Sequence, residues 1–338
     1  MKRIFFRVDG NNEVGYGHLF RCIALSEMLK DDFSIIFIEK DSNEFAKSQM
    51  YATTKNVIHL YTSSLLEEAV NISANYIDEH SVFILDGYQY TSEYQKKIKQ
   101  SGATLVCIDD LHEIHFYADI IINQAYGVNE TQYSVETRTM FCLGFDWIIQ
   151  RPSFIAISTD TREIKHFETI FFTLGGGQIL DVAPKIIGAI EQIPQIKKIV
   201  FLKGSQLVYE KDVKPILKNL SKQFEVFEGL NDSELFDLIK TCDIAICPAS
   251  VISLEACSVG IGLFAGYTAT NQYDNYKGLI TNKVAFDLGD LYTISPEHLE
   301  KSIRKNLNLE SIAIQIENQK RIFDGKSKNR YLELFKTL

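Results

Sequence analysis

Short runs of β-branched and aromatic residues alternate, along the first half of the chain, with longer segments that carry apolar residues at helical spacing. This pattern predicts strands at Arg3–Val8, Phe33–Glu39, Val57–Leu60, Ser81–Asp86, Thr104–Ile108 and Asp119–Ile122. It predicts helices between them at His18–Lys30, Ser64–Glu79 and Thr91–Gln100. Because strands and helices follow one another in turn, we expect crossover connections and a parallel sheet.

The same alternation starts again in the second half of the chain. It predicts strands at Thr169–Leu174, Lys198–Leu202, Phe224–Phe227, Asp243–Cys247 and Gly262–Ala265. It predicts helices from about Asp181 and at Ser233–Thr241 and Val251–Val259. The fold class is therefore α/β, with two open Rossmann-like sheets in tandem.

The length of 338 residues also suits two domains. We expect the boundary near Ser153–Thr161, which gives residues 1–153 and 154–295 as the two Rossmann-like domains and 296–338 as a charged helical extension. In open sheets of this kind, ligands bind beyond the carboxyl ends of the strands. The natural site is then a cleft between the two domains.

Charge and hydropathy exclude several classes of partner. The formal net charge of −9 disfavours nucleic acid and anionic membranes. No stretch approaches the roughly 20 apolar residues of a membrane span, and Arg7 and Asp9 interrupt the first apolar run too early for a signal peptide. The six cysteines form no C-x-x-C pair and are expected to be free buried thiols, so we expect a cytoplasmic protein without membrane insertion.

The loop after the first strand is the first candidate for chemistry. That strand ends at Asp9 and leads into a glycine-rich loop with Gly15 and Gly17, and the next helix opens near His18. Arg21 lies one turn further, on nearly the same helix face. The helix dipole favours a neutral imidazole there, which can accept a proton. The glycines alone indicate only a turn, because the third glycine of the dinucleotide fingerprint is missing, but the longer string is more specific.

That string, RVDGNNEVGYGHLFRCIALSEML, resembles the N-terminal signature of the pseudaminic-acid pathway hydrolases. These enzymes, often called PseG, act on UDP-2,4-diacetamido-2,4,6-trideoxy-β-L-altropyranose. Further segments are similar to the family at 85–88 (LDGY), 107–111 (CIDDL), 122–126 (INQAY), 143–154 (LGFDWIIQRPSF), 173–177 (TLGGG) and 243–272. The resemblance implies a GT-B fold with a cleft between its domains, kinship with MurG, a UDP-activated amino sugar as substrate, and no cofactor or metal.

The resemblance also implies a site drawn from both halves of the chain. His18 would be the general base on the attacking water, and Glu255 would accept hydrogen bonds from the ribose hydroxyls. The residues implied in substrate binding are Asp9, Gly15, Gly17, Arg21, Asp86, Tyr88, Asp109, Gly175, Gly176, Ser250, Glu255, Asn271 and Gln272. The sugar would lie against the N-terminal domain and UDP against the C-terminal domain. The helix after Ser250 agrees with this on physical grounds, since its first N–H groups can face a diphosphate.

A metal site is not expected. Asp109 and Asp110 are adjacent at the end of a strand, so their side chains point in opposite directions and rarely hold one ion. The sequence has no D-x-D motif, and His112 and His115 in the following loop have an ordinary spacing. We therefore expect metal-independent activity.

Two loops depart from the family pattern. The glycine loop ends in Gly177–Gln178 where the family has a hydroxyl residue and an aspartate, and 248–250 read Pro-Ala-Ser where the family is glycine-rich. Three hypotheses therefore remain: hydrolysis of a UDP-sugar, transfer of the sugar by an inverting GT-B glycosyltransferase, and binding of a nucleotide sugar without turnover. His18 and Arg21 argue against the third.

Overall fold

The chain forms two compact units in the computed structural model, which describes residues 1–157, 162–175, 181–204, 207–215, 217 and 220–338. The first unit contains residues 1–150 and 326–338, and the second contains residues 151–325. The expected extension at 296–338 includes three helices: α10 and α11 belong to the second unit and α12 to the first.

The first unit is built on a seven-stranded sheet in the order β3-β2-β1-β4-β5-β7-β9. Its strands are β1 (Arg3–Arg7), β2 (Ser34–Glu39), β3 (Val57–His59), β4 (Ser81–Asp86), β5 (Thr104–Ile108), β7 (Ile120–Asn123) and β9 (Met140–Leu143). Every neighbouring pair is parallel, as the alternation of strands and helices predicts. A separate pair, β6 (His115–Phe116) and β8 (Ser134–Val135), follows β5.

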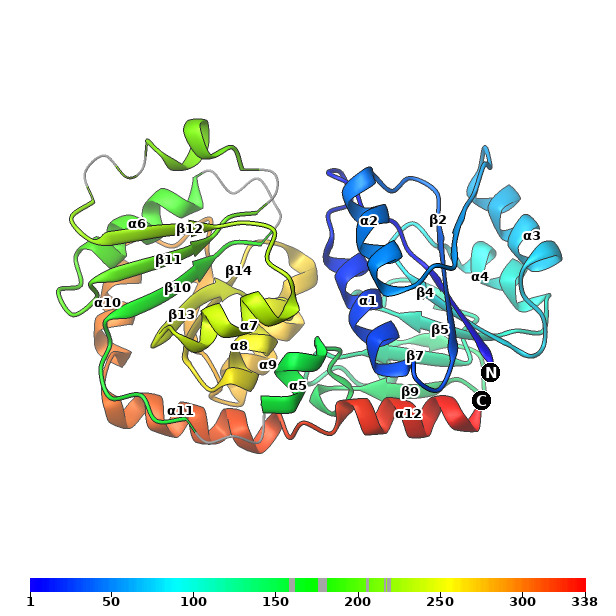
Figure 1. Cartoon of the computed structure of the whole chain (residues 1–338). Coiled ribbons are helices and arrows are strands. Elements are labelled where there is room, and N and C mark those ends of the chain that lie inside the picture. The colour runs from blue at the N-terminus through cyan, green and yellow to red at the C-terminus, as the bar shows by residue number, and fades with distance from the viewer. Residues whose placement is uncertain (158–161, 176–180, 205–206, 216, 218–219) are drawn as a thin grey trace. The chain divides into compact units, whose positions relative to one another are not determined.

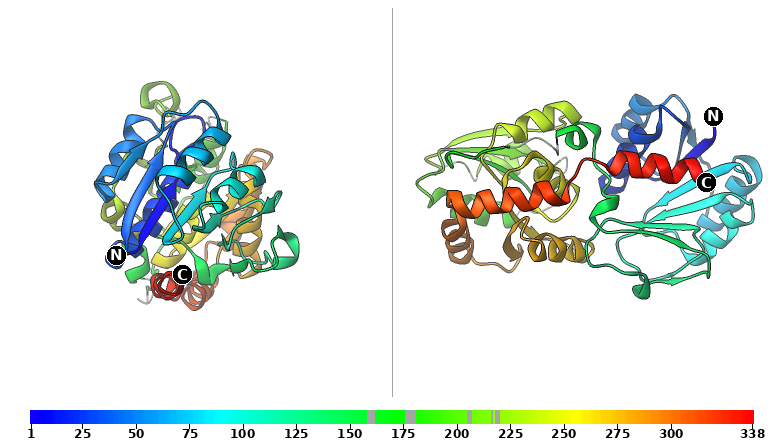
Figure 2. Two further views of the ribbon diagram at one scale, coloured as in Figure 1. Left: turned by 90° about the vertical axis from the view of Figure 1, so that its right-hand side faces the viewer. Right: turned by 90° about the horizontal axis from the view of Figure 1, so that it is seen from below.

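Helices cover both faces of this sheet, with α1 and α2 on one face and α3 and α4 on the other (Figure 1). The helices are α1 (Gly17–Leu29), α2 (Glu44–Thr53), α3 (Leu65–Asn75), α4 (Ser92–Lys99) and α12 (Ser327–Thr337). All six residues of β4 are buried, which explains its unbroken apolar sequence. The two termini meet in this unit, where the Lys2 ammonium donates to the carbonyl of Leu338 (Figures 1 and 2).

The second unit is built on a six-stranded parallel sheet in the order β12-β11-β10-β13-β14-β15. Its strands are β10 (Thr169–Thr173), β11 (Lys198–Leu202), β12 (Gln223–Phe227), β13 (Ile244–Pro248), β14 (Gly262–Tyr267) and β15 (Phe286–Asp290). Its helices are α5 (Pro152–Ile157), α6 (Val182–Glu191), α7 (Asp232–Lys240), α8 (Val251–Val259), α9 (Tyr273–Thr281), α10 (Pro296–Asn306) and α11 (Leu309–Ile322). None of the helices in the described residues is long and apolar enough to cross a membrane.

Strand order marks one point in each sheet where a ligand is expected. The order reverses between β1 and β4 in the first sheet and between β10 and β13 in the second. At such a switch point, the connections leave the two central strands on opposite faces and open a crevice beyond their carboxyl ends. The loops that follow β1, β4, β10 and β13 are therefore where a ligand is expected.

Candidate active site

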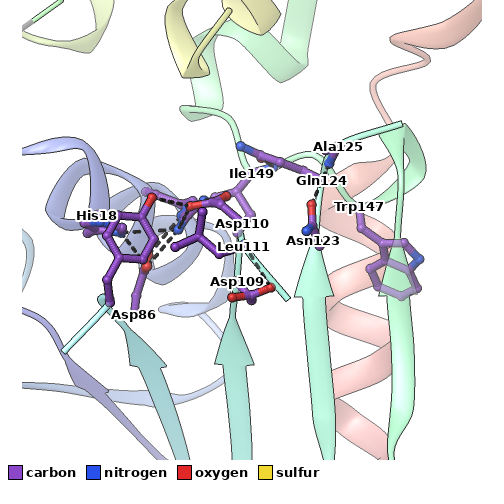
Figure 3. Close-up of polar contacts among 12 residues, drawn as sticks. His18, Asp86, Asp109, Asp110, Leu111, Asn123, Gln124, Ala125, Trp147 and Ile149 are labelled. Carbon is purple, nitrogen blue, oxygen red and sulfur yellow. Dashed lines mark hydrogen bonds and ion pairs between the residues drawn. The ribbon is translucent and has the colours of Figure 1, made fainter. Parts of the chain in front are cut away.

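The loops at the first switch point bring together a polar cluster that contains the candidate base. Figure 3 shows His18, from the start of α1, beside Asp86 at the end of β4 and Asp110 after β5. Nδ1 of His18 lies 2.7 Å from Oδ1 of Asp86. Because the Asp86 carboxylate can only accept, Nδ1 donates to it, and in the neutral imidazole Nε2 then keeps its lone pair. The His18 side chain is 15% exposed, so part of the imidazole reaches solvent.

Arg21 lies between two carboxylates in the same cluster. Its Nε and Nη2 donate to Asp86 at 2.9 and 2.7 Å, and its Nη1 and Nη2 donate to Asp110 at 2.6 and 3.0 Å. Burial alone would raise the pKa of Asp86, but the charges of Arg21 and His18 outweigh it and hold that pKa well below its usual range. Asp86 is therefore an anion throughout the neutral range, and it can stabilise an imidazolium on His18.

Tyr88 completes the cluster on its solvent side. Its ring meets the imidazole of His18 edge to face, with centroids 4.6 Å apart, and its hydroxyl donates to Oδ2 of Asp110 at 3.1 Å. The residue is 49% exposed. An exposed aromatic ring beside a base suits contact with a substrate rather than core packing.

The glycine loop positions the start of α1. Gly15 has a φ of +76°, which only glycine adopts readily, and its N–H donates to the carbonyl of Asn11 at 2.9 Å. Gly17 begins the helix, and a β-carbon there would meet nothing within 4 Å. In this described loop, no side chain caps the helix and its first turn has no acidic residue. The N-terminus of α1 is thus open beside His18.

Asp109 and Asp110 point in opposite directions, as the sequence predicts for adjacent residues. Oδ2 of Asp109 accepts hydrogen bonds from the N–H groups of Leu111 and His112 at 3.2 and 2.8 Å and from the Tyr133 hydroxyl at 3.1 Å. Burial raises the pKa of Asp109. Asp109 therefore holds the turn after β5, and it is Asp110 that joins the Arg21 cluster. Across the described residues, no group of three or more metal-ligating side chains is arranged to hold an ion.

The sequence missed Asp110 as a site residue, although a signal was present. Asp86 pairs in register with Ile108, and side chains two residues apart on a strand share a face. Asp110 lies two residues after Ile108, so the alternation of side chains places Asp110 on the same face of the sheet as Asp86 and places Asp109 on the opposite face.

Asp9 belongs to a different network from His18. Its Oδ2 accepts from Nη1 of Arg7 at 2.7 Å, and its Oδ1 accepts from the N–H groups of Lys40 and Asp41 at 2.7 and 3.1 Å. Arg7 in turn donates to both oxygens of Glu68, at 2.6 and 3.0 Å. Asp9 thus holds the loop after β2 in place beneath the glycine loop.

The second switch point brings together candidate phosphate-binding groups. Gly175 follows β10 with a φ of +78°, and Ser250 follows β13 and opens α8. In this part of the described chain, the Ser250 side chain caps no N–H of α8, and the first turn of this nine-residue helix has no acidic residue. An uncapped helix N-terminus suits an anion. Gly176, Gly177 and Gln178 lie outside the described residues.

Glu255 lies one turn into α8 and is fully buried. Its two oxygens accept from Nε and Nη2 of Arg151 at 2.7 and 2.5 Å. Burial alone would lower the pKa of Arg151, but the charge of Glu255 raises it. A carboxylate offers about four acceptor positions, and Arg151 occupies two of those of Glu255.

Asn271 and Gln272 follow β14, the strand beside β13, and lie in a short helical turn at Thr270–Gln272. Oε1 of Gln272 accepts from the N–H of Thr268 at 2.8 Å, which closes this loop. The parallel strands place the loop at the same edge of the sheet as Gly175 and Ser250.

Comparison with known proteins gives related sequences and a clear fold. No model of a known protein family matches the chain. The spore coat polysaccharide biosynthesis protein SpsG of Bacillus subtilis is 27% identical over 286 residues, covering 83% of this chain and 82% of that protein. The UDP-2,4-diacetamido-2,4,6-trideoxy-beta-L-altropyranose hydrolase of Campylobacter jejuni is 23% identical over 224 residues, covering 65% of this chain and 73% of the hydrolase.

Among solved structures, MurG of Acinetobacter baumannii matches the whole of both chains with a TM-score of 0.68 at 12% sequence identity. The two parallel sheets and this likeness show that the fold is of the GT-B type, as predicted from the sequence. The sequence comparisons make the chain a distant relative of SpsG and of the Campylobacter hydrolase.

Proposed function

We propose that the protein hydrolyses the anomeric C1–O bond of a UDP-linked 2,4-diacetamido-2,4,6-trideoxy sugar, a step of pseudaminic-acid-type nonulosonate biosynthesis. The observation that carries the proposal is the 2.7 Å contact of His18 Nδ1 with Asp86, which leaves Nε2 as a base at the carboxyl edge of the first sheet. The relation to the Campylobacter hydrolase supports this choice of substrate.

In the proposed reaction, a water oxygen attacks C1 while Nε2 of His18 takes a proton from that water. The bond between C1 and the β-phosphate oxygen breaks, and its electron pair leaves with UDP. One such displacement inverts C1 and needs no carboxylate nucleophile. Asp86 stabilises the imidazolium, and general-base catalysis of this kind contributes about 10²- to 10⁴-fold in rate.

The second unit would hold the leaving UDP. The open N-terminus of α8 after Ser250 and the backbone at Gly175 and Gly176 would take the diphosphate, and Glu255 would accept hydrogen bonds from the ribose. Preorganised N–H donors stabilise charge that develops on a leaving group, which commonly gives the largest part of catalysis. Asn271 and Gln272 would contact the sugar or the diphosphate from the neighbouring loop.

Sugar transfer is the second candidate function. The likeness to MurG and other glycosyltransferase structures favours it, since an acceptor hydroxyl can replace water in the same displacement. The base, the metal-independent leaving-group site and the inversion at C1 would be unchanged.

A panel of UDP-sugars, with released UDP measured with and without acceptors and with chelator present, separates these functions. Hydrolysis predicts UDP release from the diacetamido substrate without acceptor and in chelator. Release that requires an acceptor would indicate a transferase. No release under any condition, with UDP still bound, would indicate a binding protein.

A further inference from the structure

The residue that precedes helix α1 is not one that a helix start favours. Tyr16 is the N-cap of α1, and its carbonyl accepts the first helical hydrogen bond, from the N–H of Phe20 at 3.0 Å. In the described chain, the Tyr16 side chain caps none of the first N–H groups of this helix. Serine, threonine, aspartate and asparagine are preferred at an N-cap because their side chains do so. The helix itself therefore does not explain this tyrosine.

The next three helices of the first unit follow the usual rule. Asn43 caps α2, Ser64 caps α3 and Thr91 caps α4, each with a side-chain oxygen that accepts from an N–H of its own helix. Among these four helices the exception is α1, which carries the proposed base, His18. A local rule that is broken beside a functional site often has a functional reason.

The Tyr16 hydroxyl forms a tether between α1 and α2. It accepts from Nδ2 of Asn43 at 2.7 Å and donates to Oδ1 of Asn12 at 2.9 Å. Its ring is buried and meets the ring of Phe45, on α2, edge to face at a centroid distance of 5.1 Å. The Tyr16 side chain is therefore fixed both at its hydroxyl and along its ring.

Asn43 holds the glycine loop at both of its ends. Its backbone N–H donates to the carbonyl of Gly10 at 3.0 Å, near the start of the loop, and its Nδ2 holds Tyr16, where the loop enters α1. Its Oδ1 accepts from the N–H of Ala46 at 3.0 Å and so caps α2. The approach is close, because a β-carbon at Gly10 would lie only 3.0 Å from that of Ala46. One asparagine thus ties both ends of the loop to the first turn of α2.

We infer that Asn43 and Tyr16 are positioning residues, which fix the first turn of α1 and thereby keep Nδ1 of His18 at hydrogen-bond distance from Asp86. His18 lies two residues after Tyr16, so a shift of the helix start moves the imidazole with it. A misplacement of about 1 Å in a catalytic group can cost up to about 10²-fold in rate. The inference rests on the proposed function, because the tether would act on catalysis through the proposed base.

The test removes the tether and keeps the helix cap. Tyr16→Phe removes the hydroxyl and keeps the ring that contacts Phe45. Asn43→Ser keeps a good N-cap for α2, but its side chain is too short to reach the Tyr16 hydroxyl. The matched control is Asn308→Ser, because Asn308 caps α11 in the second unit by accepting from the N–H of Ser311 at 2.8 Å.

Two measurements are made on each folded, full-length protein. The first is kcat and KM with the UDP-diacetamido sugar. The second is the ring ¹⁵N resonances of His18 in protein labelled with ¹⁵N-histidine, assigned by comparison with His18→Asn. Each tether variant should lower kcat about three- to tenfold, leave KM within about twofold, and shift the Nδ1 resonance of His18. The double variant should be no worse than the poorer single variant, because the two side chains act as one unit.

Melting temperatures separate positioning from a merely structural role. Asn43→Ser and Asn308→Ser make the same change at a helix cap and should lower the melting temperature by similar amounts, but only Asn43→Ser should change kcat and the His18 resonance. The inference is overturned if either kcat or the His18 resonance keeps its wild-type value in both tether variants. A wild-type protein that cleaves no UDP-sugar would overturn the proposed hydrolysis, and the resonance alone would then test whether the tether places His18.

Discussion

The first unit contains two arginine–carboxylate networks that differ in one respect. Arg7, beside α3, is bound to Glu68 and Asp9, and Tyr94 and backbone N–H groups occupy the remaining acceptor positions. Arg21, on α1, is bound to Asp86 and Asp110, but its carboxylates also reach the partly exposed His18 and Tyr88. The first network is closed on itself and the second opens at the carboxyl edge of the sheet. Similar ion pairs can therefore hold a fold in one place and hold the proposed base, His18, in another.

Replacement of Asp86 by Asn should have the largest effect. The pKa of Asp86 lies well below its usual range, so the substitution removes a charge at every working pH, and it also removes the group that fixes the His18 proton on Nδ1. We expect kcat to fall about 10²- to 10⁴-fold with a small change in KM. Steady-state kinetics on the folded variant measure this. A near-normal kcat would show that Asp86 does not orient the base.

Replacement of Glu68 by Gln should affect stability instead. It leaves the buried Arg7 charge with only Asp9 as a partner, at a cost of about 3–5 kcal/mol in the free energy of unfolding. The kcat of the folded variant should stay within about twofold of wild type, because no carboxylate of the open network is touched. Denaturant unfolding and kinetics on one preparation test this. A large loss of kcat without a loss of stability would mean that the Arg7 network serves catalysis and not the fold.

A third pair, Arg151–Glu255 in the second unit, sharpens the comparison because Glu255 is buried and Arg151 is partly exposed. If Glu255 also accepts from the ribose, Glu255→Ala should weaken UDP binding by about 1–3 kcal/mol. Calorimetry with UDP measures this directly. Asp232→Asn is the control, because Asp232 also lies near Arg151, at 3.9 Å, and its replacement leaves both hydrogen bonds between Arg151 and Glu255 in place. Unchanged UDP affinity in the Glu255 variant would mean that this pair only holds the fold, as the network of Arg7 does.

Replacement of Asp110 by Asn should have the smallest effect of the four. Arg21 keeps both hydrogen bonds to Asp86, and His18 keeps its own. We expect kcat to fall about tenfold, the value of a charge-assisted hydrogen bond. A loss as large as that of Asp86→Asn would mean that Asp110 has a direct part in the chemistry.

The sequence predicts the strands near the site well because their signal is strong. The bounds of β4, β5 and α8 match the prediction to the residue, since each is an apolar run that ends at a polar residue or a glycine. The helix α2 was missed, because only Ala46 and Met50 among its residues are buried and no apolar face shows at helical spacing.

The candidate site was predictable only in part. The glycine loop, His18 and Arg21 follow from one contiguous string of sequence. The carboxylates that bind Arg21 do not, because Asp86 lies 65 residues and Asp110 lies 89 residues further along the chain. The bond between Arg151 and Glu255, 104 residues apart, carries no local pattern at all. Pairings of this kind depend on strand order, which the sequence does not state.

Hydrolysis in H₂¹⁸O tests the central claim most directly, that His18 activates water against the anomeric carbon. The UDP-diacetamido sugar is turned over by wild type and by His18→Asn, and the label is located by mass spectrometry in the sugar or in UDP. The account predicts label in the sugar only, with a rate at least about 10²-fold lower in the variant. Label in UDP, which would mean attack at phosphorus, or a variant that keeps near-normal kcat would contradict it.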